Sequence, residues 1–149
     1  MDRYATTETR ALPADWRSLR VADIMTIDPV TISSDASIES AERLLRVNRI
    51  TGLPVLDPEG DLVGVISQTD LLLAGRPSIE AALRNRPSGL RVGELMTSPA
   101  LTVPLDTPLH EAARLMRDAH VHRLVAVDDE RRPVGVLAAM DYVMLFAET

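Results

Sequence analysis

The sequence predicts an α+β fold made of two copies of one β-α-β-β-α unit, and three observations support this. The motif VADIMT at residues 21–26 returns as VGELMT at residues 92–97, and the motifs that follow keep this offset of 71 residues. One segment of each copy repeats apolar side chains every three or four positions, as an amphipathic helix does. Each copy also has two short runs rich in β-branched residues around a polar turn. Because the same offset separates every pair of matching motifs, the sequence indicates duplication of one structural unit.

Each element is recognisable in the first copy. A short apolar strand is expected at residues 30–32, and it leads through a polar turn into an amphipathic helix. The apolar face of this helix consists of Ile38, Ala41, Leu44 and Leu45. The runs LPVLD and LVGVIS flank the segment DPEGD, which favours a hairpin turn because it contains Pro and Gly. A second helix is expected to open at Asp70.

The second copy has the same elements in the same order. Its first strand is expected at residues 101–103, the runs LVAVD and PVGVLA flank the turn DDERR, and the last helix opens at Asp141. The apolar face of its first helix consists of Leu109, Ala112, Leu115 and Met116. A half of roughly 60 to 70 residues cannot cover both faces of its own sheet. We therefore expect the two repeats to pack sheet to sheet about a pseudo-twofold axis.

The chain is expected to have four segments. Residues 1–18 form a polar arm without periodicity, residues 19–75 the first repeat and residues 91–149 the second. Residues 76–90 join the repeats as a helical linker, with the helical pattern at residues 79–85.

Composition limits the classes of function. The chain has 149 residues, 46% of them hydrophobic, which is enough for a core. Its net charge of −6 argues against binding to nucleic acid or an anionic membrane. All sixteen basic residues are arginines, so any phosphate contact must come from Arg, His or the backbone. There is no cysteine, so disulfides and thiolate chemistry are excluded. Without a signal peptide or a long apolar run, we expect a soluble cytoplasmic protein.

The stretch Ser67-Gln68-Thr69-Asp70 follows an apolar strand and allows two interpretations. Hydroxyls and a carboxylate at the start of a helix commonly cap it. The same groups, beside free backbone N–H groups, also suit a phosphate and a sugar diol. The residues alone leave both interpretations open.

Several motifs resemble those of the CBS domain, and the pair resembles the Bateman module. They are DIMT and ELMT, ITGLPVLDPEGDLVGVISQTDLL, and VHRLVAVDDERRPVGVLAAMDYV. The resemblance covers about residues 19–146. It implies tandem CBS domains of the stand-alone type, without an effector domain, forming a disc that dimerises through its helices. It also implies sites for AMP, ADP, ATP or S-adenosylmethionine in the cleft between the repeats, as in sensors of energy or metabolites.

The resemblance also suggests the site residues. In the family, a Ser/Thr-x-x-Asp motif holds the nucleotide, with the Asp accepting from the ribose hydroxyls and the Ser or Thr facing phosphate. Ser67, Thr69 and Asp70 match this motif in full. The second repeat is expected to contribute the residues that bind the adenine and the phosphate. These contributions come from Ala100, Leu101, Val121, His122 and Arg123.

A second site is expected to be weaker. Its stretch Ala138-Ala139-Met140-Asp141 keeps the carboxylate but has no hydroxyl, and uncharged Thr51 and Gly52 stand where the other site has His and Arg. The residues assigned to this site are Pro29, Val30, Ile50, Thr51 and Asp141.

These observations favour a regulatory module that senses an adenosine-containing ligand and signals to a partner protein. The chain is expected to be a homodimer, to need no cofactor and to have no enzymatic activity, because no nucleophile–base set or Gly-rich phosphate loop is present. The alternative is a ligand-free scaffold that only dimerises and interacts. No metal site is expected: His110 and His120 belong to helix surfaces, and His120 and His122 have no nearby acidic partner.

Overall fold

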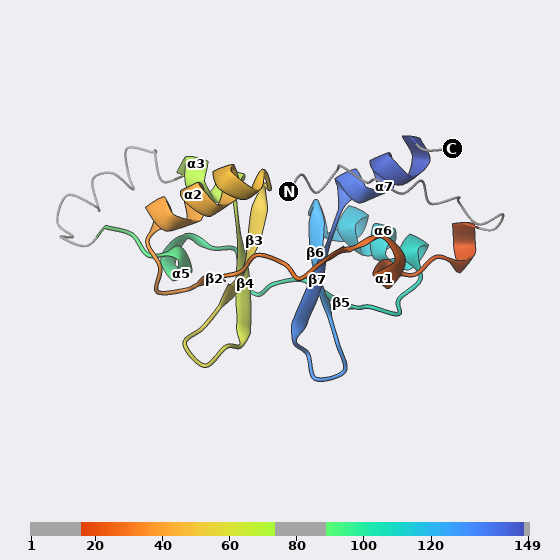
Figure 1. The fold of residues 1–149 in the computed structure, drawn as a ribbon, viewed down its shortest axis with the longest axis horizontal. Helices are drawn as coiled ribbons and strands as arrows, with labels where there is room; N and C mark the ends of the chain where they lie inside the picture. Colours follow the sequence, from red (N-terminus) through yellow and green to blue (C-terminus); the bar gives the residue numbers. More distant parts are fainter. Residues whose placement is uncertain (1–15, 74–88, 148–149) are drawn as a thin grey trace. The chain divides into compact units, whose positions relative to one another are not determined.

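The computed structural model describes residues 16–73 and 89–147 (Figure 1). The helical piece predicted at residues 79–85 and most of the predicted arm lie outside the described residues. The fold is α+β, as predicted. The chain divides into two compact units, which are described one at a time. Unit 1 contains residues 1–29 and 101–149, and unit 2 contains residues 30–100.

Unit 2 has a three-stranded sheet in the order β2-β3-β4. The strands β2 (Ile32–Ser33) and β3 (Gly52–Leu56) are parallel, and β4 (Leu62–Ser67) is antiparallel to β3. The helices of this unit are α2 (Ile38–Asn48), α3 (Gln68–Leu73) and α5 (Val92–Leu95), and α3 lies beside α2 (Figure 1). The buried core consists of Ile32, Ala41, Leu45, Leu53, Val55, Ile66 and Val92.

Unit 1 has a four-stranded sheet in the order β1-β7-β6-β5. Its strands are β1 (Thr26–Ile27), β5 (Thr102–Pro104), β6 (Arg123–Val127) and β7 (Pro133–Ala138). Its helices are α1 (Val21–Ile24), α6 (Leu109–Ala119) and α7 (Ala139–Ala147), and a 3-10 turn, η1, spans Trp16–Ser18. The buried core consists of Leu19, Val21, Val103, Leu109, Ala112, Met116, Leu124, Ala126 and Leu137.

The two compact units do not coincide with the two sequence repeats. Helix α1, which precedes the first repeat's first strand, belongs to unit 1 with the β6–β7 hairpin of the second repeat, and α5 belongs to unit 2 with the β3–β4 hairpin of the first repeat. The backbone N–H of Val21 donates to Thr107 O at 2.9 Å in unit 1, and that of Val92 donates to Ala36 O at 2.8 Å in unit 2. These two bonds are equivalent under the 71-residue offset. The boundaries between the compact units therefore lie after residues 29 and 100. The repeat boundaries at 19–75 and 91–149 stay a prediction.

The short elements α1, α5 and β1 were not predicted. They contain four, four and two residues. Segments this short have little stability of their own, and tertiary contacts hold them. The strand β1, for example, pairs Thr26 with Val136 of β7.

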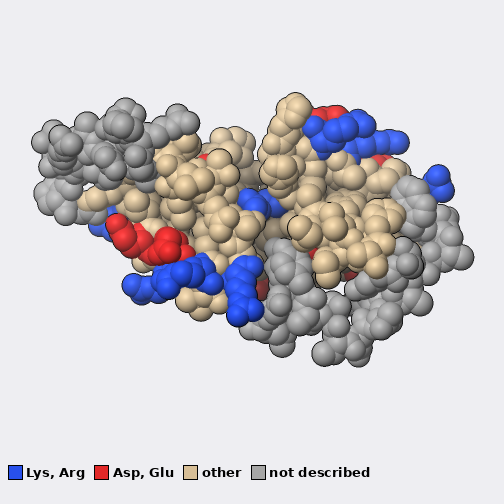
Figure 2. Space-filling view, turned by 90° about the horizontal axis from the view of Figure 1, so that it is seen from above, with Lys and Arg blue, Asp and Glu red and all other residues tan. Residues whose placement is uncertain are grey.

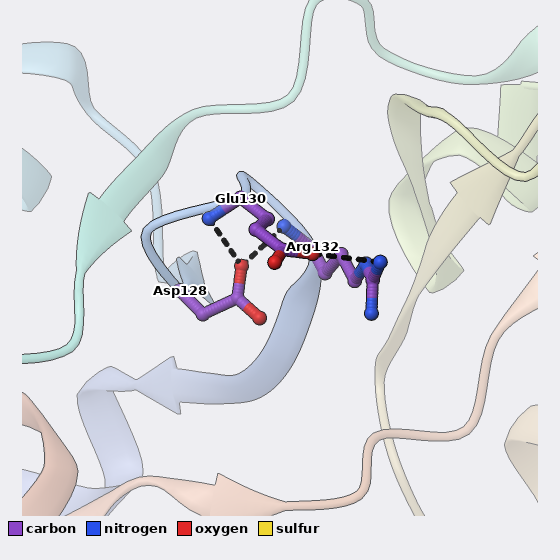
Figure 3. A network of polar contacts seen from close by, with 3 residues as sticks. All are labelled: Asp128, Glu130 and Arg132. Carbon is purple, nitrogen blue, oxygen red and sulfur yellow. Dashed lines mark hydrogen bonds and ion pairs between the residues drawn. The ribbon is translucent and has the colours of Figure 1, made fainter.

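The predicted hairpin turn of the second repeat is closed by side-chain contacts (Figure 3). The Oδ1 atom of Asp128 accepts hydrogen bonds from the backbone N–H groups of Glu130 and Arg132, both at 2.9 Å. The side chains of Arg132 and Glu130 pair at 2.7 Å across the same turn. In the first repeat, Asp57 Oδ1 accepts from Asp61 N at 2.8 Å, so an Asp closes both turns.

Candidate functional site

The Asp70 carboxylate lies at the junction between β4 and α3, where it is only 8% exposed. Its Oδ2 atom accepts hydrogen bonds from Ser67 N at 2.9 Å and from Ser67 Oγ at 3.1 Å. In return, Asp70 N donates to Ser67 Oγ at 3.3 Å. This reciprocal pair is a capping arrangement, so the capping interpretation of the motif is correct. It also explains why α3 begins at Gln68, two residues before the position predicted.

A third hydrogen bond reaches Asp70 from a segment far along the chain. Thr97 Oγ1 donates to Asp70 Oδ1 at 3.2 Å. The backbone of Thr97 is fixed against β4, because it exchanges two hydrogen bonds with Val65 at 2.9 and 3.0 Å. The sequence did not point to Thr97 as a site residue. Its only signal was the Met-Thr pair that recurs at residues 25–26 and 96–97.

The Asp70 carboxylate keeps one acceptor position that receives no donor from the described residues. A carboxylate only accepts hydrogen bonds and has about four acceptor positions. The described residues fill three of them with neutral donors, two on Oδ2 and one on Oδ1. Asp70 can therefore accept one further hydrogen bond.

The other residues predicted for this site lie in both units. Thr69 is exposed on α3, and Ala100 is half-buried at the end of unit 2. The remaining four, Leu101, Val121, His122 and Arg123, lie in unit 1. His122 is exposed, and its carbonyl accepts from Ala139 N at 2.8 Å, whereas Arg123 begins β6. Their grouping with Asp70 stays a prediction.

At the equivalent junction of the second repeat, Ala138 and Asp141 stand where the first repeat has Ser67 and Asp70. Asp141 Oδ2 accepts from Ala138 N at 2.7 Å, matching the bond between Ser67 N and Asp70. Alanine at 138 has no hydroxyl, so the second bond to Oδ2 has no equivalent from this position. Pro29 and Asp141 belong to unit 1, and Val30, Ile50 and Thr51 belong to unit 2. Val30 and Ile50 pack against the core of unit 2.

Tyr142, next to Asp141, is held by burial and one hydrogen bond. Its hydroxyl donates to Leu109 O at 2.7 Å. Burial, with a smaller contribution from the charge of Asp141, raises the pKa of Tyr142 to about 12. The neutral phenol is therefore the form that the fold favours.

The raised pKa of Tyr142 predicts a loss of stability at high pH. Stability from this group is fully present below the ordinary pKa of 10.0 and falls as the pH rises through about 12. Urea unfolding at a series of pH values should show this decline between those limits. The Tyr142→Phe variant should be less stable at neutral pH and lose less stability over that range. An equally steep decline in the variant would contradict the assignment.

Among the described residues, no group of three or more His, Asp and Glu side chains could hold a metal ion. His120 ends α6 in a left-handed backbone conformation, with a φ of 55°. His110 differs from the prediction of a surface residue, because it is half-buried on α6. Its buried Nδ1 atom has no hydrogen-bond partner among the described residues.

Charges on the face drawn in Figure 2 are mixed. Most of this face is uncharged, and in places arginines lie beside acidic side chains. On α2, the Nε atom of Arg46 and the Oε1 atom of Glu42 are 3.3 Å apart. The described part of this face therefore presents no continuous basic surface of the kind that binds a phosphate backbone.

The sequence model of the CBS domain matches residues 21–76 and 92–148, so it covers both repeats. The chain belongs to the CBS domain family. This confirms the family predicted from the motifs, as a tandem pair of CBS domains.

Two solved structures of CBS pairs are similar over most of the chain. One is the CBS domain pair of protein MJ0100, in complex with 5'-methylthioadenosine and S-adenosyl-L-methionine. It is 30% identical with a TM-score of 0.76, over 87% of this chain and 96% of that one. The other is CBSX2 of Arabidopsis thaliana in complex with AMP. It is 32% identical with a TM-score of 0.74, over 87% of this chain and 96% of that one.

A curated relative shows the pair inside a larger protein. L-aspartate semialdehyde sulfurtransferase of Methanocaldococcus jannaschii is 32% identical over 126 residues, which are 85% of this chain and 23% of that protein. The first curated relatives extend well beyond the CBS pair, since the chain spans between 23% and 63% of their lengths. Among the described residues of the CBS pair, no helix is long and apolar enough to cross a membrane.

Proposed function

We propose that this CBS pair is a regulatory module that binds an adenosine-containing ligand through Asp70. The observation that carries the proposal is the buried Asp70 carboxylate, which Ser67 and Thr97 hold in place and which can still accept a hydrogen bond. A ribose 2′,3′-diol presents two donors to one carboxylate. The similar CBS pairs bound to AMP and to S-adenosyl-L-methionine support this class of ligand, because both ligands carry an adenosine.

The proposed site uses the residues that the sequence motifs assigned. The ribose donates to Asp70, whose carboxylate Ser67 holds in place, and the hydroxyl of Thr69 faces the phosphate or the equivalent charged end. Adenine lies against Ala100 and Leu101. Residues 121–123, Val-His-Arg, bind the phosphate, and Arg123 keeps its charge at any working pH. The Asp141 site, which also involves Pro29, Val30, Ile50 and Thr51, binds more weakly.

The proposed role is regulation by the bound ligand, with the signal passed to a partner protein inside the cytoplasm. The ligand is a signal and not a required cofactor, and the pair performs no chemistry on it. The relatives that are enzymes carry the CBS pair as a small part of a longer chain, and this supports a regulatory role.

Isothermal titration calorimetry of the purified chain against AMP, ADP, ATP and S-adenosylmethionine tests the proposal. We expect at least one of the four to bind with one ligand per chain, and GTP, the control without adenine, to bind more weakly. A ligand at a hundred times its dissociation constant should add about 2.7 kcal/mol to the free energy of unfolding, which thermal unfolding detects independently. Flat titrations and unchanged melting temperatures for all four ligands would refute the proposal.

The alternative function is a ligand-free scaffold that dimerises through its helices. It is favoured by exposed apolar side chains on α6 and α7, since α7 has no buried residue. These side chains are Leu115, Met140, Val143 and Phe146, between 46% and 56% exposed. Flat titrations together with a dimer mass in sedimentation equilibrium would support the scaffold. A dimer that also binds ligand is the outcome we expect.

A further inference from the structure

We propose that Thr97 sets how strongly the Asp70 site distinguishes ribose from deoxyribose. The inference rests on the proposed function and concerns the same carboxylate. The Thr97 hydroxyl fills an acceptor position on Asp70 Oδ1. A ribose diol needs that position, whereas a 2′-deoxyribose does not.

The hydrogen bonds of the Asp70 carboxylate carry this argument. Of its roughly four acceptor positions, three receive Ser67 N, Ser67 Oγ and Thr97 Oγ1. The described residues thus leave one position for a ligand. A 2′-deoxyribose, with its single 3′-hydroxyl, fits that position as it stands. A ribose brings two donors, so one of the three protein donors must leave before both can bind.

Thr97 is the donor that leaves. Ser67 N is part of the β4 backbone and cannot turn away. Ser67 Oγ is tied to Asp70 twice, because it also accepts from Asp70 N. The bond from Thr97 is the longest of the three at 3.2 Å, and Thr97 is an exposed residue.

Thr97 can release Asp70 without disturbing the fold. Two backbone hydrogen bonds to Val65 keep its main chain on β4. A change of the χ1 rotamer is therefore enough to turn the hydroxyl from the carboxylate to water. Ribose binding thus gains two hydrogen bonds and loses one, while deoxyribose binding gains one and loses none. The Thr97 hydroxyl consequently reduces the preference for ribose.

The test compares AMP with 2′-deoxy-AMP on the wild-type chain and on Thr97→Val. Valine has the shape of threonine without the hydroxyl. We expect Thr97→Val to bind AMP about two- to tenfold more tightly, which corresponds to one neutral hydrogen bond, and to bind 2′-deoxy-AMP within about twofold of wild type. The ratio of the two affinities should rise by the same two- to tenfold factor. Calorimetric dissociation constants provide the readout.

Two control variants separate this effect from a general change in the fold. Thr97→Ser keeps the hydroxyl and should keep the wild-type ratio. Thr26→Val removes the same hydroxyl at the equivalent position of unit 1, where Thr26 pairs with Val136 as Thr97 pairs with Val65. It should also keep the wild-type ratio at the Asp70 site. Urea unfolding of each variant verifies that it is folded under the titration conditions.

The outcomes distinguish this inference from the proposed function. If wild type binds AMP but Thr97→Val binds it equally or more weakly, the role of Thr97 is refuted and the proposed function stands. If wild type binds S-adenosylmethionine and not AMP, a tighter complex of Thr97→Val with S-adenosylmethionine supports the inference, and an unchanged one refutes it. If wild type binds none of the adenosine ligands, the proposed function fails, and this inference with it.

Discussion

Replacing Asp70 with alanine is expected to abolish binding of the adenosine ligand and to lower the free energy of unfolding by about 1–3 kcal/mol. Binding is lost because the ribose hydroxyls lose their acceptor. Stability falls because Ser67 N and the hydroxyls of Ser67 and Thr97 lose a common partner at a buried position. Calorimetric titration measures the first effect, and urea unfolding without ligand measures the second.

Two further variants make this prediction specific. Asp70→Asn keeps the size of the side chain but replaces one acceptor oxygen with a donor, so it should weaken binding strongly while costing less stability. Asp141→Ala removes the equivalent carboxylate of the second repeat, which accepts from Ala138 N. It should leave binding at the Asp70 site intact. Full binding by Asp70→Ala would refute the role of Asp70, and loss of binding only in Asp141→Ala would show that the ligand uses the other carboxylate.

Replacing Gly64 with alanine is expected to destabilise the protein by about 1–3 kcal/mol, the usual cost of overpacking a filled site. A Cβ atom at this position would lie 2.7 Å from Met96 Sδ and 2.7 Å from Thr97 O. The methionine could move, but Thr97 O is a backbone atom that accepts from Val65 N, so the strand contact itself must shift. The midpoint of urea unfolding measures the effect.

Gly135→Ala is the matched variant in the other unit. A Cβ atom there would lie 2.5 Å from Met25 Sδ and 2.9 Å from Thr26 O, so the same loss of stability is expected. Propensity alone predicts the opposite sign, because alanine in a strand is normally about 0.5–1 kcal/mol better than glycine. If either variant unfolds at the same or a higher urea concentration than wild type, the close contact at that glycine does not reduce stability, and the prediction is wrong.

Local patterns predicted the elements that are long enough to show periodicity. Most of the predicted helix faces lie in the buried cores, for example Ala41 with Leu45 and Ala112 with Met116, but Leu115 was predicted on such a face and is 47% exposed. The starts of α3 and α7 were predicted two residues late. The reason is that Asp70 and Asp141 accept from the residue three positions earlier, which places that residue just before the helix.

The candidate site was predicted only in part. Ser67 and Asp70 share one strand–helix junction, so a local motif was enough to find them. Thr97 was missed because it contacts Asp70 across 27 positions of the sequence, and nothing in its local pattern requires that contact. The structure shows Ser67 and Asp70 capping the helix, and their use for a ligand stays our proposal.

Periodicity and repetition are properties of the chain alone, so the sequence was enough to predict that one β-α-β-β-α unit is duplicated and where its amphipathic helices lie. The positions of α1 and α5 depend instead on contacts between distant parts of the chain. Each has four residues and too little stability to fix its own place, so hydrogen bonds such as Val21 N to Thr107 O and Val92 N to Ala36 O place them. Because α5 is held in this place, Thr97, which follows it, can donate a hydrogen bond to the Asp70 carboxylate of the first repeat.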